Sequence, residues 1–149
     1  MAKFKVVTPK GTRSNGPVRA ALYGDPSGYQ KTANDEIILM PMIETKTAIG
    51  NLDAILDVPG LDAIYVGPSD LSFSYGKEPK LDVDDPEILA IYDKLIAATS
   101  KRGQAAGIHC GSAAYAKRAI KMGFKLVTIS NEVGIMVNAA KAAIAEARS

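Results

Sequence analysis

Two acidic side chains, Glu44 and Asp70, stand at the ends of two apolar stretches of the chain. Residues 37–43 read IILMPMI and stop at Glu44, and residues 61–66 read LDAIYV and lead through a short turn to Asp70. Apolar runs of this length, bounded by turn residues, are typical of buried strands. Because the carboxyl ends of parallel strands meet on one face of a fold, we expect the two carboxylates to lie side by side.

Two carboxylates held close together repel each other unless a proton or a cation lies between them. Oxygen ligands of this kind suit Mg²⁺ or Mn²⁺, with water and substrate oxygens completing the coordination shell. The sequence therefore predicts a divalent metal site at Glu44 and Asp70. The alternative is that both are ordinary carboxylates at strand ends, solvated or capping a helix.

His109 is the only histidine of the chain, and it ends a short predicted strand at residues 104–109. It should point to the same face as the two acids, where an imidazole can act as an acid, a base or a ligand. The alternative is a hydrogen-bonded core histidine. Cys110 is the only cysteine, so no internal disulfide can form, and we predict a small packed residue in a protein of a reducing compartment.

Strands and helices alternate along the rest of the chain. Further strands are predicted at residues 63–66 and 125–129. Apolar periodicity predicts helices at residues 29–36, 45–56, 86–101, 113–122 and 133–148. Four strands that alternate with helices indicate an α/β fold with a parallel sheet. The segment between Asp70 and Pro86 is rich in turn formers and is predicted to form a loop over the site.

The first 36 residues read as a lead-in, and residues 37–149 as the folded domain. Residues 3–8 could form a short strand, and residues 9–28 carry many glycines and prolines, which indicates a long loop. Arg13 and Arg19 lie in that loop. They are either solvated or available for anion binding or a subunit contact.

Composition excludes several classes of partner. A chain of 149 residues fits one domain, and 47% hydrophobic with 23% charged residues is ordinary for a globular protein. A net charge of +2 without a basic cluster gives no indication of nucleic-acid binding. No apolar run approaches the roughly 18 residues of a membrane span, so we expect a cytoplasmic protein without a membrane partner.

The number of strand–helix units has a consequence for assembly. Four such units are half of an eightfold TIM-type barrel, which takes about 250 residues. A half barrel leaves two open sheet edges and an uncovered inner face, and both recruit partners. We therefore expect a (βα)₄ half barrel completed by self-association, or a chain that is part of a longer protein.

Three stretches carry a family resemblance: KGTRSNGPVRAALYG, NDEIILMPMIETKTAIGNLDAILDVPGLDAIYVGPSDLSFSYG and AAGIHCGSAAYAKRAIKMGFKLVTIS. They strongly resemble the pyruvate-dependent class II aldolases. These metal-dependent lyases cleave 4-hydroxy-2-oxoheptanedioate or 2-keto-3-deoxyglucarate, and they are akin to citrate lyase beta. The resemblance covers nearly the whole chain, and it aligns with the C-terminal half of the family barrel.

The resemblance implies roles for several residues. Glu44 and Asp70 match the two metal-binding carboxylates, and Gly67, Pro68 and Ser69 match the turn that receives the carboxylate of pyruvate. The family's general-base histidine and its keto-oxygen arginine belong to the N-terminal half and have no matching positions here. Where a glutamine is common in the family, this chain has Met42.

The chemistry that the resemblance implies needs two kinds of group. Cleavage beside a keto acid leaves an enolate of pyruvate, whose charge a divalent ion stabilises. A base must also take the proton of the distal hydroxyl. We hypothesise that His109 substitutes for the absent base across an interface between two half barrels. The alternative function is a catalytically silent half barrel that binds metal or anions and self-associates; an acyl-CoA lyase is disfavoured because no adenine-binding feature is visible.

Overall fold

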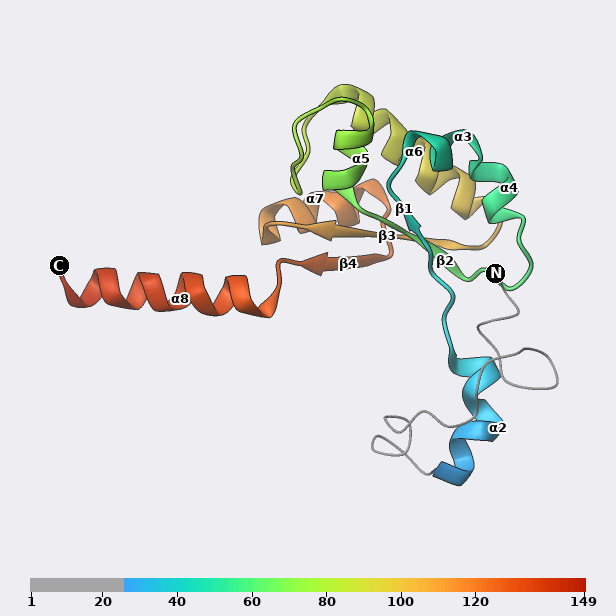
Figure 1. Cartoon of the computed structure of the whole chain (residues 1–149), viewed down its shortest axis with the longest axis horizontal. Helices are drawn as coiled ribbons and strands as arrows, with labels where there is room; N and C mark the ends of the chain where they lie inside the picture. Colours follow the sequence, from blue (N-terminus) through green and yellow to red (C-terminus); the bar gives the residue numbers. More distant parts are fainter. Residues whose placement is uncertain (1–25) are drawn as a thin grey trace.

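A computed structural model describes residues 26–149 and shows one four-stranded sheet in the order β1-β2-β3-β4, with every neighbouring pair parallel (Figure 1). The strands are β1 (Met42–Ile43), β2 (Ala63–Val66), β3 (Ala105–Cys110) and β4 (Leu126–Ile129). Strand order follows chain order, as successive strand–helix units of a barrel require. The predicted α/β fold with a parallel sheet is therefore confirmed.

Helices follow each strand, and those in the middle of the chain lie together on one side of the sheet (Figure 1). The helices are α2 (Pro26–Glu36), α3 (Lys46–Gly50), α4 (Leu52–Leu56), α5 (Pro68–Ser74), α6 (Pro86–Ser100), α7 (Ala113–Met122) and α8 (Glu132–Ala147). Both α2 and α8 extend away from this body. None of the helices in residues 26–149 is long and apolar enough to cross a membrane.

The two faces of the sheet differ in burial. The face under the helices carries the core side chains Ile43, Ile64, Val66, Ile108 and Cys110, each at most 1% exposed. Side chains on neighbouring strand positions alternate between faces, so the opposite face carries Met42 and Leu126, which are 52% and 43% exposed. The face that would line a barrel is thus open, which is the arrangement of a half barrel.

The first predicted strand is much shorter than expected. Residues 37–43 were predicted as a buried strand, but only Met42–Ile43 forms one, and Ile38 is 69% exposed. The preceding residues still run beside β2, because the Leu39 carbonyl accepts from Ala63 N–H at 3.3 Å and the Pro41 carbonyl accepts from Tyr65 N–H at 2.9 Å. Pro41 has no N–H to donate in return. The segment lies at a sheet edge and cannot complete the ladder.

Two further predictions need correction. The predicted helix at residues 45–56 is two short helices, α3 and α4, which meet at Asn51, although Thr45 caps the first one as expected. The segment after Asp70 was predicted to be a loop, but its beginning belongs to α5. That helix begins with Pro68, whose fixed φ suits a first helical position.

The longer helices agree with the prediction. Asp85 caps α6, Ser112 caps α7, and α7 ends at Gly123, whose φ of 117° lies in the left-handed region that favours glycine. Among the described residues, Ser130 between β4 and α8 is the non-glycine residue with a positive φ (53°). The predicted strand at residues 3–8, and Arg13 and Arg19, lie outside the described residues.

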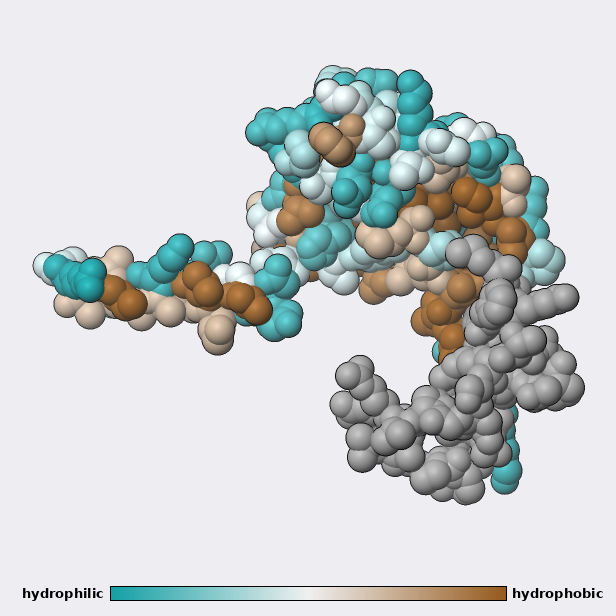
Figure 2. Space-filling model, viewed as in Figure 1, coloured by the Kyte–Doolittle hydropathy of each residue, from teal (hydrophilic) through white to brown (hydrophobic). Residues whose placement is uncertain are grey.

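Helix α8 exposes an apolar surface. Figure 2 shows hydrophobic residues along this helix, which projects from the body of the molecule. The large exposed hydrophobic side chains of α8 are Val133, Ile135, Met136, Val137 and Ile144. None of its residues is buried.

Candidate active site at the carboxyl ends of the strands

Glu44 lies against Gly67. The register of β1 and β2 pairs Ile43 with Val66, so the next residues of the two strands, Glu44 and Gly67, are neighbours. A Cβ atom on Gly67 would lie 2.5 Å from Glu44 Oε2. The φ of Gly67 is −97°, which other residues also adopt, so glycine matters here for space: a larger residue would displace the end of the Glu44 side chain. The absent side chain leaves room for the Glu44 carboxylate.

Asp70 lies on the first turn of α5, three residues beyond Gly67. The predicted turn at Gly67, Pro68 and Ser69 is therefore the entry into a helix. The N–H groups of a first helical turn have no acceptor inside the helix. Asp70 itself is exposed, and Pro68 is buried.

A cavity of about 260 Å³ brings several predicted residues together. It is lined by the segment 67–70 and by Met42, Tyr65, Leu81 and His109. His109 thus shares a cavity with Asp70 and the turn. Glu44 is not part of its lining and reaches this region through its contact with Gly67.

The two carboxylates have no protein partner in residues 26–149: neither Glu44 nor Asp70 makes a hydrogen bond or ion pair there. The same part of the chain contains no cluster of three or more His, Cys, Asp or Glu side chains that could hold a metal ion. Among the described residues, Glu44 and Asp70 therefore offer carboxylate oxygens to a cation without a third His, Cys, Asp or Glu side chain beside them. This donor set fits Mg²⁺ or Mn²⁺, which keep several water or substrate oxygens in their shells.

His109 belongs to a row of polar side chains that the sequence analysis missed. Its Nδ1 lies 2.7 Å from Thr128 Oγ1 on β4, and the hydroxyl of Tyr65 on β2 hydrogen-bonds the same oxygen. Tyr65 also lines the cavity. Alternation along the strands could have placed these residues on the open face, but only the register shows that they meet.

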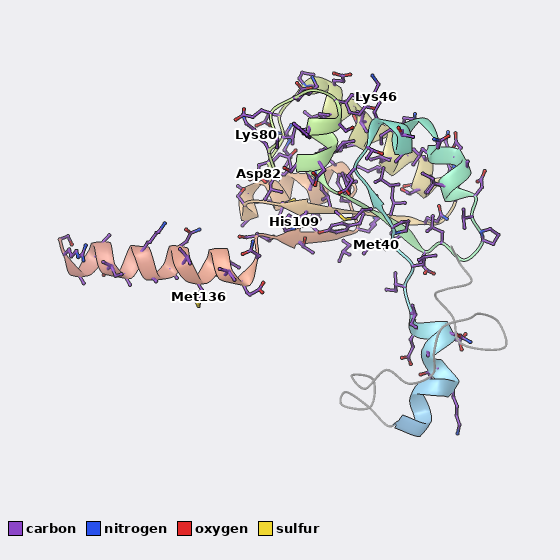
Figure 3. The ribbon with its side chains drawn as sticks, viewed as in Figure 1. Met40, Lys46, Lys80, Asp82, His109 and Met136 are labelled. Carbon is purple, nitrogen blue, oxygen red and sulfur yellow. The ribbon has the colours of Figure 1, made fainter. Side chains whose placement is uncertain are left out.

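The loop between α5 and α6 covers one side of the cavity, as predicted for part of this segment. Leu81 contributes to the cavity lining, and Asp82 Oδ1 accepts from Gly111 N–H at 2.7 Å. Figure 3 shows His109 on the sheet beside the loop that carries Lys80 and Asp82. The loop is thus attached to the end of β3.

Cys110 follows His109 but faces the core. Its side chain is buried, and burial raises the pKa of its thiol to about 11. A thiol of this kind is protonated near neutral pH and is not a nucleophile. This agrees with the predicted packing role.

A sequence model of the HpcH/HpaI aldolase/citrate lyase family matches residues 3–139. The chain belongs to this family. The resemblance to pyruvate-dependent aldolases is therefore confirmed at the level of the family. It covers the segments that form the sheet and the cavity described above.

Similar proteins of this aldolase family have related activities in their names. A hydroxypyruvate/pyruvate aldolase of Rhizorhabdus wittichii is 36% identical over 143 residues, which are 95% of this chain and 56% of that protein. A 2-keto-3-deoxy-L-rhamnonate aldolase of Klebsiella pneumoniae is 36% identical over 123 residues, 81% of this chain and 45% of that protein. The chain thus spans about half the length of the curated relatives it matches.

Solved structures of the aldolase family share the fold. A family protein from Burkholderia cenocepacia superposes with a TM-score of 0.83 at 29% identity, over 99% of this chain and 59% of the other. An HpcH/HpaI aldolase from Desulfitobacterium hafniense superposes with a TM-score of 0.82 at 24% identity, over 99% of this chain and 57% of the other. The four strand–helix units are half of a TIM-type barrel.

Proposed function

We propose that this chain is the metal-binding half of a carbon–carbon lyase that cleaves 4-hydroxy-2-oxo or 2-keto-3-deoxy acids into pyruvate and an aldehyde. The observation that carries the proposal is the packing of the Glu44 carboxylate on Gly67, at the turn that leads to Asp70. Membership of the aldolase family supports the class of reaction.

In this proposal Glu44 and Asp70 hold the divalent ion, Mg²⁺ or Mn²⁺. When bound, the ion supplies positive charge that stabilises the negative charge developing on the substrate. Support comes from the two carboxylates themselves, which have no competing hydrogen bond or ion pair among residues 26–149.

The turn of residues 67–69 binds the substrate carboxylate. Pro68 has no N–H, but the N–H groups of Ser69 and Asp70 in the first turn of α5 have no acceptor in the helix and can donate to an anion. Support comes from the cavity, which this turn shares with His109 and Tyr65. Substrate bound there would extend along the open face of the sheet.

His109 takes the proton of the substrate hydroxyl within its own chain, rather than across an interface, because it lines the same cavity as the turn. As that proton moves to the imidazole, the adjacent carbon–carbon bond breaks, the aldehyde leaves, and the bonding electrons form the enolate of pyruvate. Return of the proton to the enolate carbon yields pyruvate and restores His109. In this proposal His109 substitutes for the family's general-base histidine, which has no matching position in this chain.

Self-association completes the barrel. The open sheet face and the exposed apolar side chains of α8 both leave hydrophobic surface in water, which favours a second copy. The half barrels would then face each other, so that one copy closes the cavity of the other.

A catalytically silent half barrel is the second candidate. The chain spans about half of its curated relatives, and two carboxylates alone bind Mg²⁺ weakly. Such a protein would bind metal or anions and self-associate without turnover.

The test is pyruvate release from 4-hydroxy-2-oxo acids, measured with Mg²⁺ or Mn²⁺ added and after removal by chelation. We expect release only with metal, and its loss in Glu44→Gln and Asp70→Asn. The matched control is Asp93→Asn, an exposed carboxylate on α6. Metal binding without pyruvate release would favour the silent half barrel, and release that persists in Asp70→Asn would contradict the assigned ligand.

A further inference from the structure

A row of three hydrogen-bonding side chains crosses the open face of the sheet, one from each of three adjacent strands. Tyr65 comes from β2, His109 from β3 and Thr128 from β4. His109 and Thr128 are register partners, and His109 Nδ1 lies 2.7 Å from Thr128 Oγ1. The Tyr65 hydroxyl bonds the same Thr128 oxygen.

Gly107 allows the row to form. Tyr65 is the register partner of Gly107, and a Cβ atom at position 107 would lie 2.8 Å from Tyr65 Cδ2. The tyrosine ring therefore lies over the space that a side chain at 107 would fill. This is how a residue on β2 reaches past β3 to Thr128 on β4.

The row of hydrogen bonds admits two arrangements of its protons, because the distances alone do not assign a donor to either contact of Thr128. A threonine hydroxyl offers two lone pairs and one hydrogen, whereas a phenol and an imidazole N–H are good donors. With Thr128 between two such donors, its oxygen can accept from both, and because Thr128 is exposed its own hydrogen can bond water. In that arrangement Nδ1 of His109 carries the proton and Nε2 keeps its lone pair. In the other arrangement Thr128 accepts from Tyr65 and donates to Nδ1, and Nε2 carries the proton.

We propose that Thr128, held in place by Tyr65, fixes His109 as the tautomer protonated at Nδ1 and so leaves Nε2 as the proton acceptor of the cavity. This inference deepens the proposed function, on which the role of His109 as a base rests. Tyr65 and Thr128 are positioning residues, since they act through His109. Neither is required to touch the reacting atoms.

This arrangement suits a base. The Nδ1–H bond to Thr128 persists when Nε2 takes a proton from the substrate hydroxyl, so no group has to rotate during the transfer. A hydrogen bond to a charged group is stronger than one to a neutral group. The same Thr128 oxygen therefore holds the neutral ring in place and stabilises the imidazolium.

Nitrogen-15 NMR of the full chain tests the tautomer directly, because His109 is its only histidine and gives the only imidazole signals. Spectra are recorded over a series of pH values, and the tautomer is read from the nitrogen shifts of the neutral ring. We expect Nδ1 to be the protonated nitrogen in the wild type. A majority of Nε2–H in the wild type would overturn the proposal.

Three variants show whether the hydroxyl row sets this tautomer. In Thr128→Val, loss of one hydrogen bond should lower the ratio of Nδ1–H to Nε2–H about fivefold. Thr128→Ser keeps the hydroxyl and should keep the ratio, and Tyr65→Phe should lie between the two. A wild-type ratio in Thr128→Val would overturn the role of Thr128, and the serine variant shows that this position tolerates substitution.

The activity assay separates this inference from the proposed function. With an active protein, Thr128→Val should lose about tenfold or more in kcat/KM, because the bond to the charged ring is absent in the transition state, and Thr128→Ser should restore it. Pyruvate release with an Nε2–H tautomer would overturn the inference and leave the function standing. The expected tautomer without any pyruvate release would leave the inference standing and count against the function.

Discussion

At the scale of single residues, the position of the Glu44 carboxylate depends on Gly67, which has no side chain. A Cβ atom on Gly67 would lie 2.5 Å from Glu44 Oε2. In Gly67→Ala the flexible end of Glu44 must move, while the backbone at a φ of −97° needs no change. We expect Mn²⁺ affinity to fall about tenfold and the free energy of unfolding to change by less than about 1 kcal/mol.

The measurements are a Mn²⁺ titration and urea unfolding of the same samples. Gly50→Ala is the matched control, because a Cβ there meets nothing within 4 Å and the position ends α3. It should keep the metal affinity and gain up to about 1 kcal/mol in unfolding free energy. Equal Mn²⁺ affinity in Gly67→Ala and wild type would count against Glu44 as a ligand.

Cys110 provides a prediction that is independent of function. Its thiol is buried and has a pKa raised to about 11 by burial, so at pH 8 only about one molecule in a thousand carries the thiolate. We expect an aromatic disulfide reagent to label the native protein only as fast as the protein unfolds. The urea-unfolded chain should react at once, and rapid native labelling would show that the thiol is accessible.

At the scale of elements, one carboxylate links a loop to a helix. Asp85 caps α6 through Glu87 N–H at 2.9 Å, and its other oxygen bonds Lys77 Nζ at 2.8 Å. The hydrogen bond from the Lys77 ammonium is the main reason why the pKa of Asp85 lies below its ordinary value. A lowered folded-state pKa means that ionised Asp85 stabilises the folded protein above the unfolded-state pKa of about 3.9.

The prediction concerns Asp85→Asn, which keeps a capping side chain and removes the charge. The variant should unfold at lower urea concentration than wild type at pH 7. The difference should shrink as the pH falls below about 3.9 and through the lowered pKa. Asp93→Asn on the same helix is the matched control and should leave the urea concentration of unfolding at pH 7 unchanged, since Asp93 has no ion pair in the described chain.

The helix at 113–122 was predicted more accurately than the strand at 37–43, for a local reason. The helix at 113–122 is capped by Ser112 and followed by Gly123 in the left-handed conformation. Residues adjacent to the helix therefore determine where it begins and ends. The strand at 37–43 depends instead on a neighbour that can return its hydrogen bonds, and Pro41 prevents this. Its length could not be read from its apolar residues.

The site was predicted in part for the same reason. Glu44, Asp70 and His109 were found because each follows an apolar run, and the cavity does bring His109 to Asp70. The partners of His109 were missed, because the contact of Tyr65 with Thr128 depends on register and on Gly107 between them. Long-range register is not encoded in any local pattern.

At the scale of the whole molecule, the exposed apolar surface predicts association. We expect sedimentation to give an even oligomer for the wild type. Met136→Glu, on the apolar side of α8, should weaken association about tenfold or more, because burial of a methionine contributes about 1.5–3 kcal/mol. A wild-type protein that is a stable monomer would contradict the proposed assembly.

Asn138→Glu is the matched control for this experiment. It introduces the same charge two residues further along α8, which is about 200° around the helix and so nearly on the opposite side. It should leave the sedimentation behaviour of the wild type unchanged. Equal effects of the two substitutions would indicate that charge, rather than the apolar side of the helix, controls association.

The bend at Ser130 gives this assembly a geometric constraint. Its positive φ turns the chain between β4 and α8, and its N–H is bound to the Cys110 carbonyl at 2.8 Å. A left-handed serine costs about 1–3 kcal/mol, and this cost is tolerated only where surrounding bonds hold it. The direction of α8 is therefore fixed relative to β3, the strand that carries His109. A second copy that binds α8 would in turn have a fixed orientation relative to the cavity.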